Sequence, residues 1–333
     1  MTYRIFIILN LLFICKTTFV KAQEKFWQEV RGPYRGVVST MILTSKATLL
    51  AGINEAGANK VYRSSDNGNT WNPVLSVNGT VLSFGIDSTQ GRIYIGVDPP
   101  LNSDPSMYYS SDDGITWNVL QAPNTYILSI VVTSPGNIFL GTYNGIYKSI
   151  NSGQNWNLIH NASDNNLIDA LEFTPSGNLL IGTFLGGVYT SPDSGLSWTS
   201  IGLEGKRWTY PIKYSKTGSI YVGSNNGLLV SKDYGLTWNN IDSLSDGGVH
   251  SFDFDKNGNL YVGLAGWTYY TLNPSLGMCF STDNGENWHR IGLKKYSISS
   301  VIIGTDGTIF VGSDGGIHRS IDKGNNWQSI GID

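Results

Sequence analysis

Hydrophobic and polar residues alternate in short runs along most of the chain, and Gly, Asn or Asp residues bound each run. One representative stretch has alternating segments at 128–132, 136–141 and 145–149, separated by turns that contain Gly. Alternation with a period of two predicts half-buried antiparallel strands, because successive side chains of a strand point to opposite faces. The sequence therefore predicts an all-β chain built from short strands.

An eight-residue motif, Ser-x-Asp-x-Gly-x-Thr-Trp, follows the third segment of each group and is called the octad below. Its seven copies are spaced by 46, 39, 42, 40, 50 and 39 residues and occupy 64–71, 110–117, 149–156, 191–198, 231–238, 281–288 and 320–327. A period near 40 residues in a chain rich in Gly and aromatic residues indicates one small sheet per repeat. Four short strands repeated seven times predict a seven-bladed β-propeller with four-stranded antiparallel blades.

The residue types of the octad suit a tight turn. The Asp carboxylate is expected to accept the backbone N–H two residues on, and the Gly to supply a positive φ. The Trp brings a large apolar ring whose N–H needs a partner. The third copy carries Asn151 in place of Asp, which suits a turn role. We interpret the octad aspartates as turn-forming residues, the alternative being catalysis or metal binding.

The octads resemble the Asp-box, or BNR repeat, and the resemblance covers nearly the whole chain after residue 22. Asp-box propellers include sialidases, xyloglucan-cleaving glycosidases, sortilin-type receptors and the photosystem II stability/assembly factor group. The single seven-repeat layout is most similar to the assembly-factor group, and this resemblance implies a non-enzymatic binding scaffold. The repeat itself specifies a fold and not an activity, since function depends on sites grafted on the fold.

The first 22 residues have the pattern of a secretory signal peptide. Arg4 precedes an apolar run at 5–14, and Val20-Lys21-Ala22 places small residues at the -3 and -1 positions of a cleavage site. Cleavage after Ala22 leaves a single propeller at 23–333 that is secreted, periplasmic or displayed on the cell surface. An uncleaved anchor is the alternative, and no later segment is predicted to insert into a membrane.

Composition narrows the partners and the sources of stability. The net charge is -3, and it becomes about -6 when the three basic residues of the signal peptide leave, which argues against a nucleic acid partner. Cys279 is then the only cysteine left, so no internal disulfide is expected. We interpret it as a buried strand residue, and we expect a monomer stabilised by packing.

No motif marks an active site, although a sialidase-like glycoside hydrolase remains the alternative function. Sialidases need three arginines that converge on the carboxylate of the substrate. Here only Arg31, Arg35 and Arg207 lie in predicted loops that are expected to reach a pocket. Residues 34–37 keep two of the four positions of the sialidase Phe/Tyr-Arg-Ile-Pro motif. The calcium-like start at 253–258 lacks its later acidic ligand, where Leu264 stands. The four histidines show no ligand spacing, so neither a metal nor a cofactor is expected.

Three tryptophans fall outside the octads. Trp27 is predicted to pair near the last blade and help to close the ring, whereas Trp208 and Trp267 lie in predicted loops. In a four-stranded blade, the loops between second and third strands share a face with the connections between blades, and insertions on one face often mark a binding face. The candidate ligand-binding residues are therefore Arg35, Trp208, Tyr210, Trp267, Tyr269 and Tyr270. They suit a protein or a carbohydrate partner.

A column in the first strand of the repeats changes character halfway round the ring. It contains, from the second repeat to the seventh, Gly85, Val131, Glu172, Lys213, Asp253 and Ile302. Innermost strands are crowded, so Lys213 is expected to pair with both Glu172 and Asp253. Two interpretations stay open: a structural ion network, or the floor of a pocket near the central channel.

Overall fold

The computed structural model describes residues 36–55, 58–99, 104–133, 136–162, 167–185, 187–205, 209–241, 244, 247–266 and 277–331. The predicted signal peptide and Trp27 lie outside the described residues. Within these ranges the chain is all-β, as predicted, and every sheet is built from strands that follow one another along the sequence.

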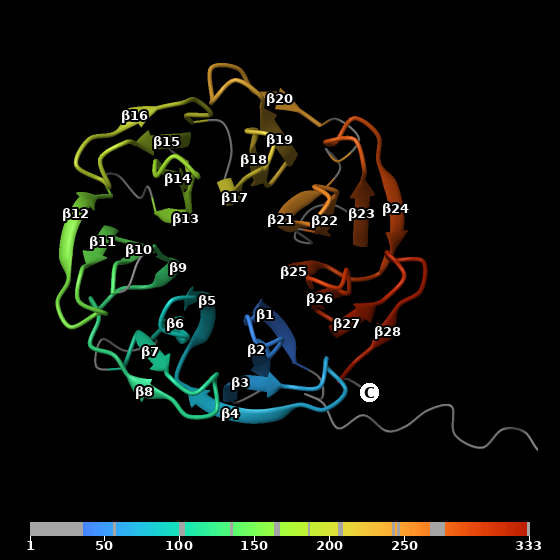
Figure 1. The fold of residues 1–333 in the computed structure, drawn as a ribbon, viewed down its shortest axis with the longest axis horizontal. Coiled ribbons are helices and arrows are strands. Elements are labelled where there is room, and N and C mark those ends of the chain that lie inside the picture. Colours follow the sequence, from blue (N-terminus) through green and yellow to red (C-terminus); the bar gives the residue numbers. More distant parts are fainter. Residues whose placement is uncertain are drawn as a thin grey trace, which may run out of the picture.

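The first strand of each group lies nearest the centre of a ring of sheets (Figure 1). These strands are β1 (Val37–Leu43), β5 (Thr80–Asp87), β9 (Ile127–Val132), β13 (Ile168–Phe173), β17 (Thr209–Tyr214), β21 (Gly248–Phe254) and β25 (Ile298–Ile303). The second strands are β2 (Leu49–Glu55), β6 (Arg92–Asp98), β10 (Ile138–Thr142), β14 (Leu179–Thr183), β18 (Ile220–Ser224), β22 (Leu260–Ala265) and β26 (Ile309–Ser313).

The third and fourth strands lie progressively farther out. The third strands are β3 (Ala58–Ser64), β7 (Met107–Ser110), β11 (Gly145–Ser149), β15 (Gly187–Ser191), β19 (Gly227–Ser231), β23 (Gly277–Ser281) and β27 (Gly316–Ser320). The fourth strands are β4 (Asn72–Val77), β8 (Asn118–Val119), β12 (Asn157–Asn161), β16 (Thr199–Ser200), β20 (Asn239–Asn240), β24 (His289–Gly292) and β28 (Gln328–Ser329). Each fourth strand follows an octad.

Most sheets contain four antiparallel strands, and one contains eight. The eight-stranded sheet forms because β19 and β21 share a single parallel pair, Gly227 with Gly248. Beside the first sheet, β25 meets β1, where the Ser299 hydroxyl donates to the Val38 carbonyl oxygen at 2.6 Å. The arrangement is that of a β-propeller.

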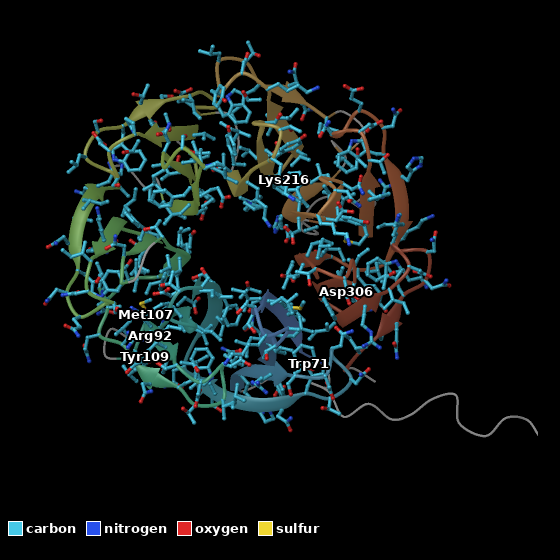
Figure 2. All side chains as sticks on the ribbon, in the orientation of Figure 1. Trp71, Arg92, Met107, Tyr109, Lys216 and Asp306 are labelled. Carbon is cyan, nitrogen blue, oxygen red and sulfur yellow. The ribbon has the colours of Figure 1, made fainter. Side chains whose placement is uncertain are left out.

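The core lies within the sheets and between neighbouring sheets. The second strands are buried along nearly all their length, and Tyr94, Phe139, Tyr221, Tyr261 and Phe310 are fully buried at one shared register position. Burying one such ring contributes about 2–3 kcal/mol. Figure 2 shows side chains filling the space around the sheets, among them Arg92, whose guanidinium lies 5.6 Å from the centre of the Tyr109 ring. Cys279 is buried on β23, as predicted.

The octad forms a turn, but its hydrogen bonds differ from those expected. The N–H of Gly68, two residues after Asp66, donates to the Ser64 hydroxyl at 2.9 Å, so the predicted acceptor was wrong. Asp66 instead accepts the backbone N–H of Thr70 at 2.9 Å and its hydroxyl at 2.6 Å. The carboxylate thus accepts hydrogen bonds within the turn, which is the structural role predicted from the sequence.

Each octad also packs on the preceding sheet, and this explains its Gly. A Cβ on Gly153, Gly195 or Gly235 would lie 2.5–2.6 Å from an aliphatic side chain of that sheet, besides requiring a positive φ. The octad Trp rings take part in the same junction, since the Trp156 N–H donates to the Gln121 carbonyl oxygen at 2.9 Å. The octads therefore join neighbouring sheets as well as neighbouring strands.

Candidate functional site

The two faces of the ring are built from different segments. The octads share one face with the turns between first and second strands, because Asp113 of an octad accepts hydrogen bonds from Thr44 and Thr48 beside the β1–β2 turn. This is called the octad face. The opposite face carries the loops between second and third strands and the connections between sheets, and it is called the loop face. At one such place the N–H of Tyr143 donates to the Tyr126 carbonyl oxygen at 3.2 Å.

Most of the predicted ligand-binding residues fall on segments that are not described. Arg35, Trp208, Trp267, Tyr269 and Tyr270 lie outside the described residues, so their grouping on the loop face stays a prediction. Tyr210 is described: it is the second residue of β17, and it is partly buried.

Bulges near the loop-face end of the first strands set a row of side chains apart. In β13 the register passes from Ile168 directly to Ala170, and in β21 from Val249 to Ser251. A bulge leaves one extra residue unpaired and re-aims its side chain. The residues at this position, called the bulge tier, are Ser39, Leu82, Leu128, Asp169, Tyr210, His250 and Ser299.

A second row, called the charge tier, contains the column predicted from the sequence. Glu172, Lys213 and Asp253 occupy the same register position on β13, β17 and β21. The Lys213 ammonium lies 2.5 Å from Asp253 Oδ1, and Asp253 Oδ2 accepts the N–H of Ile303 at 3.0 Å. Lys213 therefore links β17 to β21, and Asp253 links β21 to β25 of the next sheet.

Glu172 takes no part in that ion pair. Among the described residues no ion pair joins it to Lys213, so the expectation that Lys213 would pair with both acids is met on one side only. Burial raises the pKa of the Glu172 carboxyl to about 7, although the charge of Lys213 and a backbone hydrogen bond at Tyr214 oppose the shift. Glu172 is consequently poised to change charge near neutral pH.

In the bulge tier, β17 and β21 bring two rings together, and β13 adds a carboxylate. The rings of Tyr210 and His250 have centroids 4.2 Å apart. Burial lowers the pKa of His250 to about 4, so its imidazole is neutral at pH 7. Burial raises the pKa of Asp169 to about 7, and its Oδ2 atom is buried without a hydrogen-bond partner in the described part of the chain.

Six residues on three successive first strands, β13, β17 and β21, form one polar sector: Asp169, Glu172, Tyr210, Lys213, His250 and Asp253. The charge tier was predicted from the sequence, whereas Asp169 and His250 were not predicted. The available signal was that Asp169, Tyr210 and His250 stand at one position of three successive repeats. Leu82 and Leu128 stand at that position in two others.

A further exposed aromatic pair was missed on the loop face. Tyr126, just before β9, and Tyr143, in the β10–β11 turn, are each 45% exposed, and their rings are 5.8 Å apart, edge to face. Leu185, in the corresponding turn after β14, is 47% exposed. Applying to tyrosines the loop-face rule used for tryptophans would have found the pair.

Asp169 and Glu172 can exchange protons near neutral pH, because burial raises the pKa of each to about 7. In the described residues no group of three or more His, Cys, Asp or Glu side chains is placed to hold a metal ion. A separate hollow of about 400 Å³ lies away from the polar sector, between β20 and the octad at 281–288. The described residues contain no helix with the length and apolar character needed to span a membrane.

Comparison with known proteins shows the fold. No protein-family model and no curated protein matches the chain. Among solved structures, the chain is similar to YCF48 bound to a D1 peptide, with 17% identity and a TM-score of 0.66 over 86% of this chain and 92% of that one. It is also similar to the GH74 enzyme of Niastella koreensis, with 19% identity and a TM-score of 0.69 over 89% of this chain and 54% of that one.

An extracellular domain gives a third match. This domain belongs to a putative one-component system of B. thetaiotaomicron and is 16% identical, with a TM-score of 0.65 over 88% of this chain and 40% of that one. At these identities the matches establish a β-propeller and carry no activity across.

Proposed function

We propose that the chain is an exported, non-enzymatic Asp-box propeller that binds a protein partner on its loop face. In this proposal residues 1–22 are a signal peptide and 23–333 form one seven-bladed propeller. The eight-stranded sheet then counts as two blades, β17–β20 and β21–β24, joined by the single Gly227–Gly248 pair. We also propose that the chain acts as a monomer in the periplasm, outside the cell or on its surface.

The observation that carries the proposal is the unequal distribution of polar and aromatic side chains around the ring. The polar sector occupies β13, β17 and β21, and the exposed Tyr126–Tyr143 pair lies beside β9, the next first strand. Aromatic side chains with a polar tip favour interfaces, where the ring packs and the hydroxyl stays hydrated. The candidates Trp208 and Trp267 would extend this surface along the loop face.

The similar proteins support a protein partner and an exported location. YCF48 was solved with a D1 peptide, and two similar chains are extracellular domains from B. thetaiotaomicron. The octad supports the Asp-box assignment, because its Asp accepts hydrogen bonds within the turn. In Asp66 and Asp112 the turn hydrogen bonds lower the pKa of the carboxyl, to about 2 for Asp112, despite the opposing effect of burial.

The test is a binding screen on the purified chain 23–333 with peptide and glycan arrays, together with a fluorogenic glycosidase panel. We expect peptide binding that weakens about tenfold or more in a Tyr126→Ala/Tyr143→Ala variant, as for interface aromatic residues elsewhere. The matched control is Leu236→Ser, which removes an 86% exposed apolar side chain from the octad face and should leave binding unchanged.

Two outcomes would overturn the proposal. Turnover of any glycoside would establish a glycoside hydrolase, which is the alternative function. Binding to glycans with no peptide bound would assign a carbohydrate partner in place of a protein.

A further inference from the structure

Asp169 is the carboxylate of the polar sector that has neither an ion pair nor a hydrogen bond to its buried Oδ2 atom among the described residues. It stands at the bulge of β13, and its Oδ2 atom is buried with no hydrogen-bond partner among the described residues. Burial without a partner is costly for a carboxylate, since water is lost and nothing replaces it. A protein keeps such a group only where something else requires it.

Among the described residues, the basic side chains on the neighbouring strands are either paired with another acid or uncharged at neutral pH. Lys213, on the adjacent strand β17, is paired with Asp253 at 2.5 Å. His250 is uncharged at neutral pH because burial holds its pKa near 4. On the other side, β9 contributes Leu128 at the equivalent position. Within β13, the nearest charged residue is Glu172, which is acidic.

The fold does not need an acid at this position. The equivalent residues on β1, β5, β9 and β25 are Ser39, Leu82, Leu128 and Ser299, and those strands keep the same bulge. The junction with the next sheet is made by other atoms, since the Thr209 hydroxyl donates to the Thr183 carbonyl oxygen at 2.6 Å. Asp169 is therefore dispensable for the bulge and for the junction.

The surroundings of Asp169 suit a cation. The Tyr210 and His250 rings, tilted by 36° to each other, stand on the next two first strands, and aromatic faces attract ammonium and guanidinium groups. We propose that Asp169 binds the cationic end of a lysine or arginine side chain of the protein partner, with Tyr210 and His250 forming the adjoining wall. This inference rests on the proposed function and names the chemistry of the partner.

The proposal implies a pH dependence. The ionisable groups in the sector are Asp169, Glu172, Tyr210, Lys213, His250 and Asp253. With its pKa near 7, Asp169 is half protonated at neutral pH when no cation is bound, so binding a cation displaces a proton. Affinity for a cation should rise from pH 5.5 to pH 8 and level off above that range.

The experiment uses Nα-acetyl-lysine methylamide as the cationic probe and its norleucine analogue as the neutral probe, added to chain 23–333. Carboxyl ¹³C NMR follows Asp169, assigned by comparison with Asp169→Asn. We expect the lysine probe to bind about thirtyfold more tightly at pH 8 than at pH 5.5, as a carboxyl of this pKa requires. The norleucine probe should show no pH dependence, and Asp169→Asn should remove the lysine preference.

Two controls separate this site from general surface charge. Glu286→Gln removes one exposed acid from the octad face, and it should leave the lysine preference unchanged. In the unliganded protein the Asp169 pKa should lie near 7 and stay there in Lys206→Ala/Arg207→Ala. A pKa below 4 that rises in this double variant would show that the chain's own cation fills the site, and it would overturn the inference.

The two proposals fail differently. If Asp169→Asn binds a peptide from the array as tightly as the unaltered chain does, while Tyr126→Ala/Tyr143→Ala loses it, the inference falls and the proposed function stands. If neither variant changes peptide binding, both fall. Loss of binding in both variants supports both.

Discussion

The ring contains two arcs that share a backbone and differ in chemistry. On β1, β5 and β9 the bulge tier and the charge tier hold Leu82, Leu128, Ile42 and Val131 along with small residues, whereas β13, β17 and β21 hold the polar sector at the same register positions. The apolar arc shows that apolar or small residues at these positions are enough for the fold. The polar sector shows that the fold also accepts polar residues there. Places where local chemistry departs from the requirements of the fold are where function is expected.

The largest effect is expected when the acid is placed on the apolar arc, which tests whether the two arcs differ in what they tolerate. Leu128→Asp removes an aliphatic side chain and introduces a carboxylate with no cation on β9. We expect the free energy of unfolding at pH 8 to fall by about 4 kcal/mol. Urea denaturation measures it. Leu128→Asn serves as the uncharged control and should recover part of the loss; equal losses for Asp and Asn would show that charge is irrelevant there.

The converse change, Asp169→Asn, should stabilise the protein. Because burial raises the pKa of Asp169 to about 7, the ionised form is less stable in the folded state than in the unfolded state. The advantage of Asn should therefore be absent near pH 4, grow between pH 4 and 7, and level off above that at about 4 kcal/mol. Urea denaturation at pH 4.5 and 8 checks the sign; a destabilised Asn variant at pH 8 would contradict it.

Lys213→Met tests whether the charge tier is a structural network. Its removal leaves Asp253 without its cation, but both side chains are partly exposed, so we expect a loss of only about 1 kcal/mol. Comparison with Asp253→Asn and with the double variant isolates the pair. Altered stability with unchanged peptide binding would identify a structural network, whereas altered binding would identify the floor of a pocket.

The octads should behave alike in both arcs, with the smallest effects. Asn151 accepts the N–H of Asn155 at 3.0 Å, and Asn151→Asp should strengthen that bond by about 0.5 kcal/mol at pH 7. In the polar arc, Asp193→Asn should weaken its turn slightly. Hydrogen bonds from Ser197 lower the pKa of Asp193 to about 2, so its contribution is present above pH 4 and disappears as the pH falls towards 2. Thermal melts at pH 2 and 7 measure both changes.

The repeat made the strands and their order predictable, because one octad precedes every fourth strand. The charge tier was predictable too, since it lies in the regular part of the first strands. Asp169 and His250 were not predicted to join this site, because alternation places residues 169 and 172 on opposite sides of a regular strand. The bulge after Ile168 adds a residue and shifts that alternation, and no local pattern announced it.

Contacts between sheets were equally hidden. Arg63, at the end of β3, donates to the Asp113 carbonyl oxygen at 2.8 Å and pairs with the Asp113 carboxylate at 2.9 Å. The two residues are fifty positions apart, so only the packing of one sheet on the next brings them together.

The seating of each octad Gly on the preceding sheet has a consequence for how the chain folds. A Cβ on Gly195 would lie 2.5 Å from Ile159, and one on Gly235 would lie 2.6 Å from Ile201. A Cβ on Gly68 would lie 2.4 Å from Ile330, near the end of the chain. The octad of each repeat is thus seated on the preceding repeat, and the first octad is seated on the last repeat. Linear repeat arrays require polar end caps and unravel from their ends. Here the dependence runs in a circle, so cooperativity is expected to involve the whole ring at once.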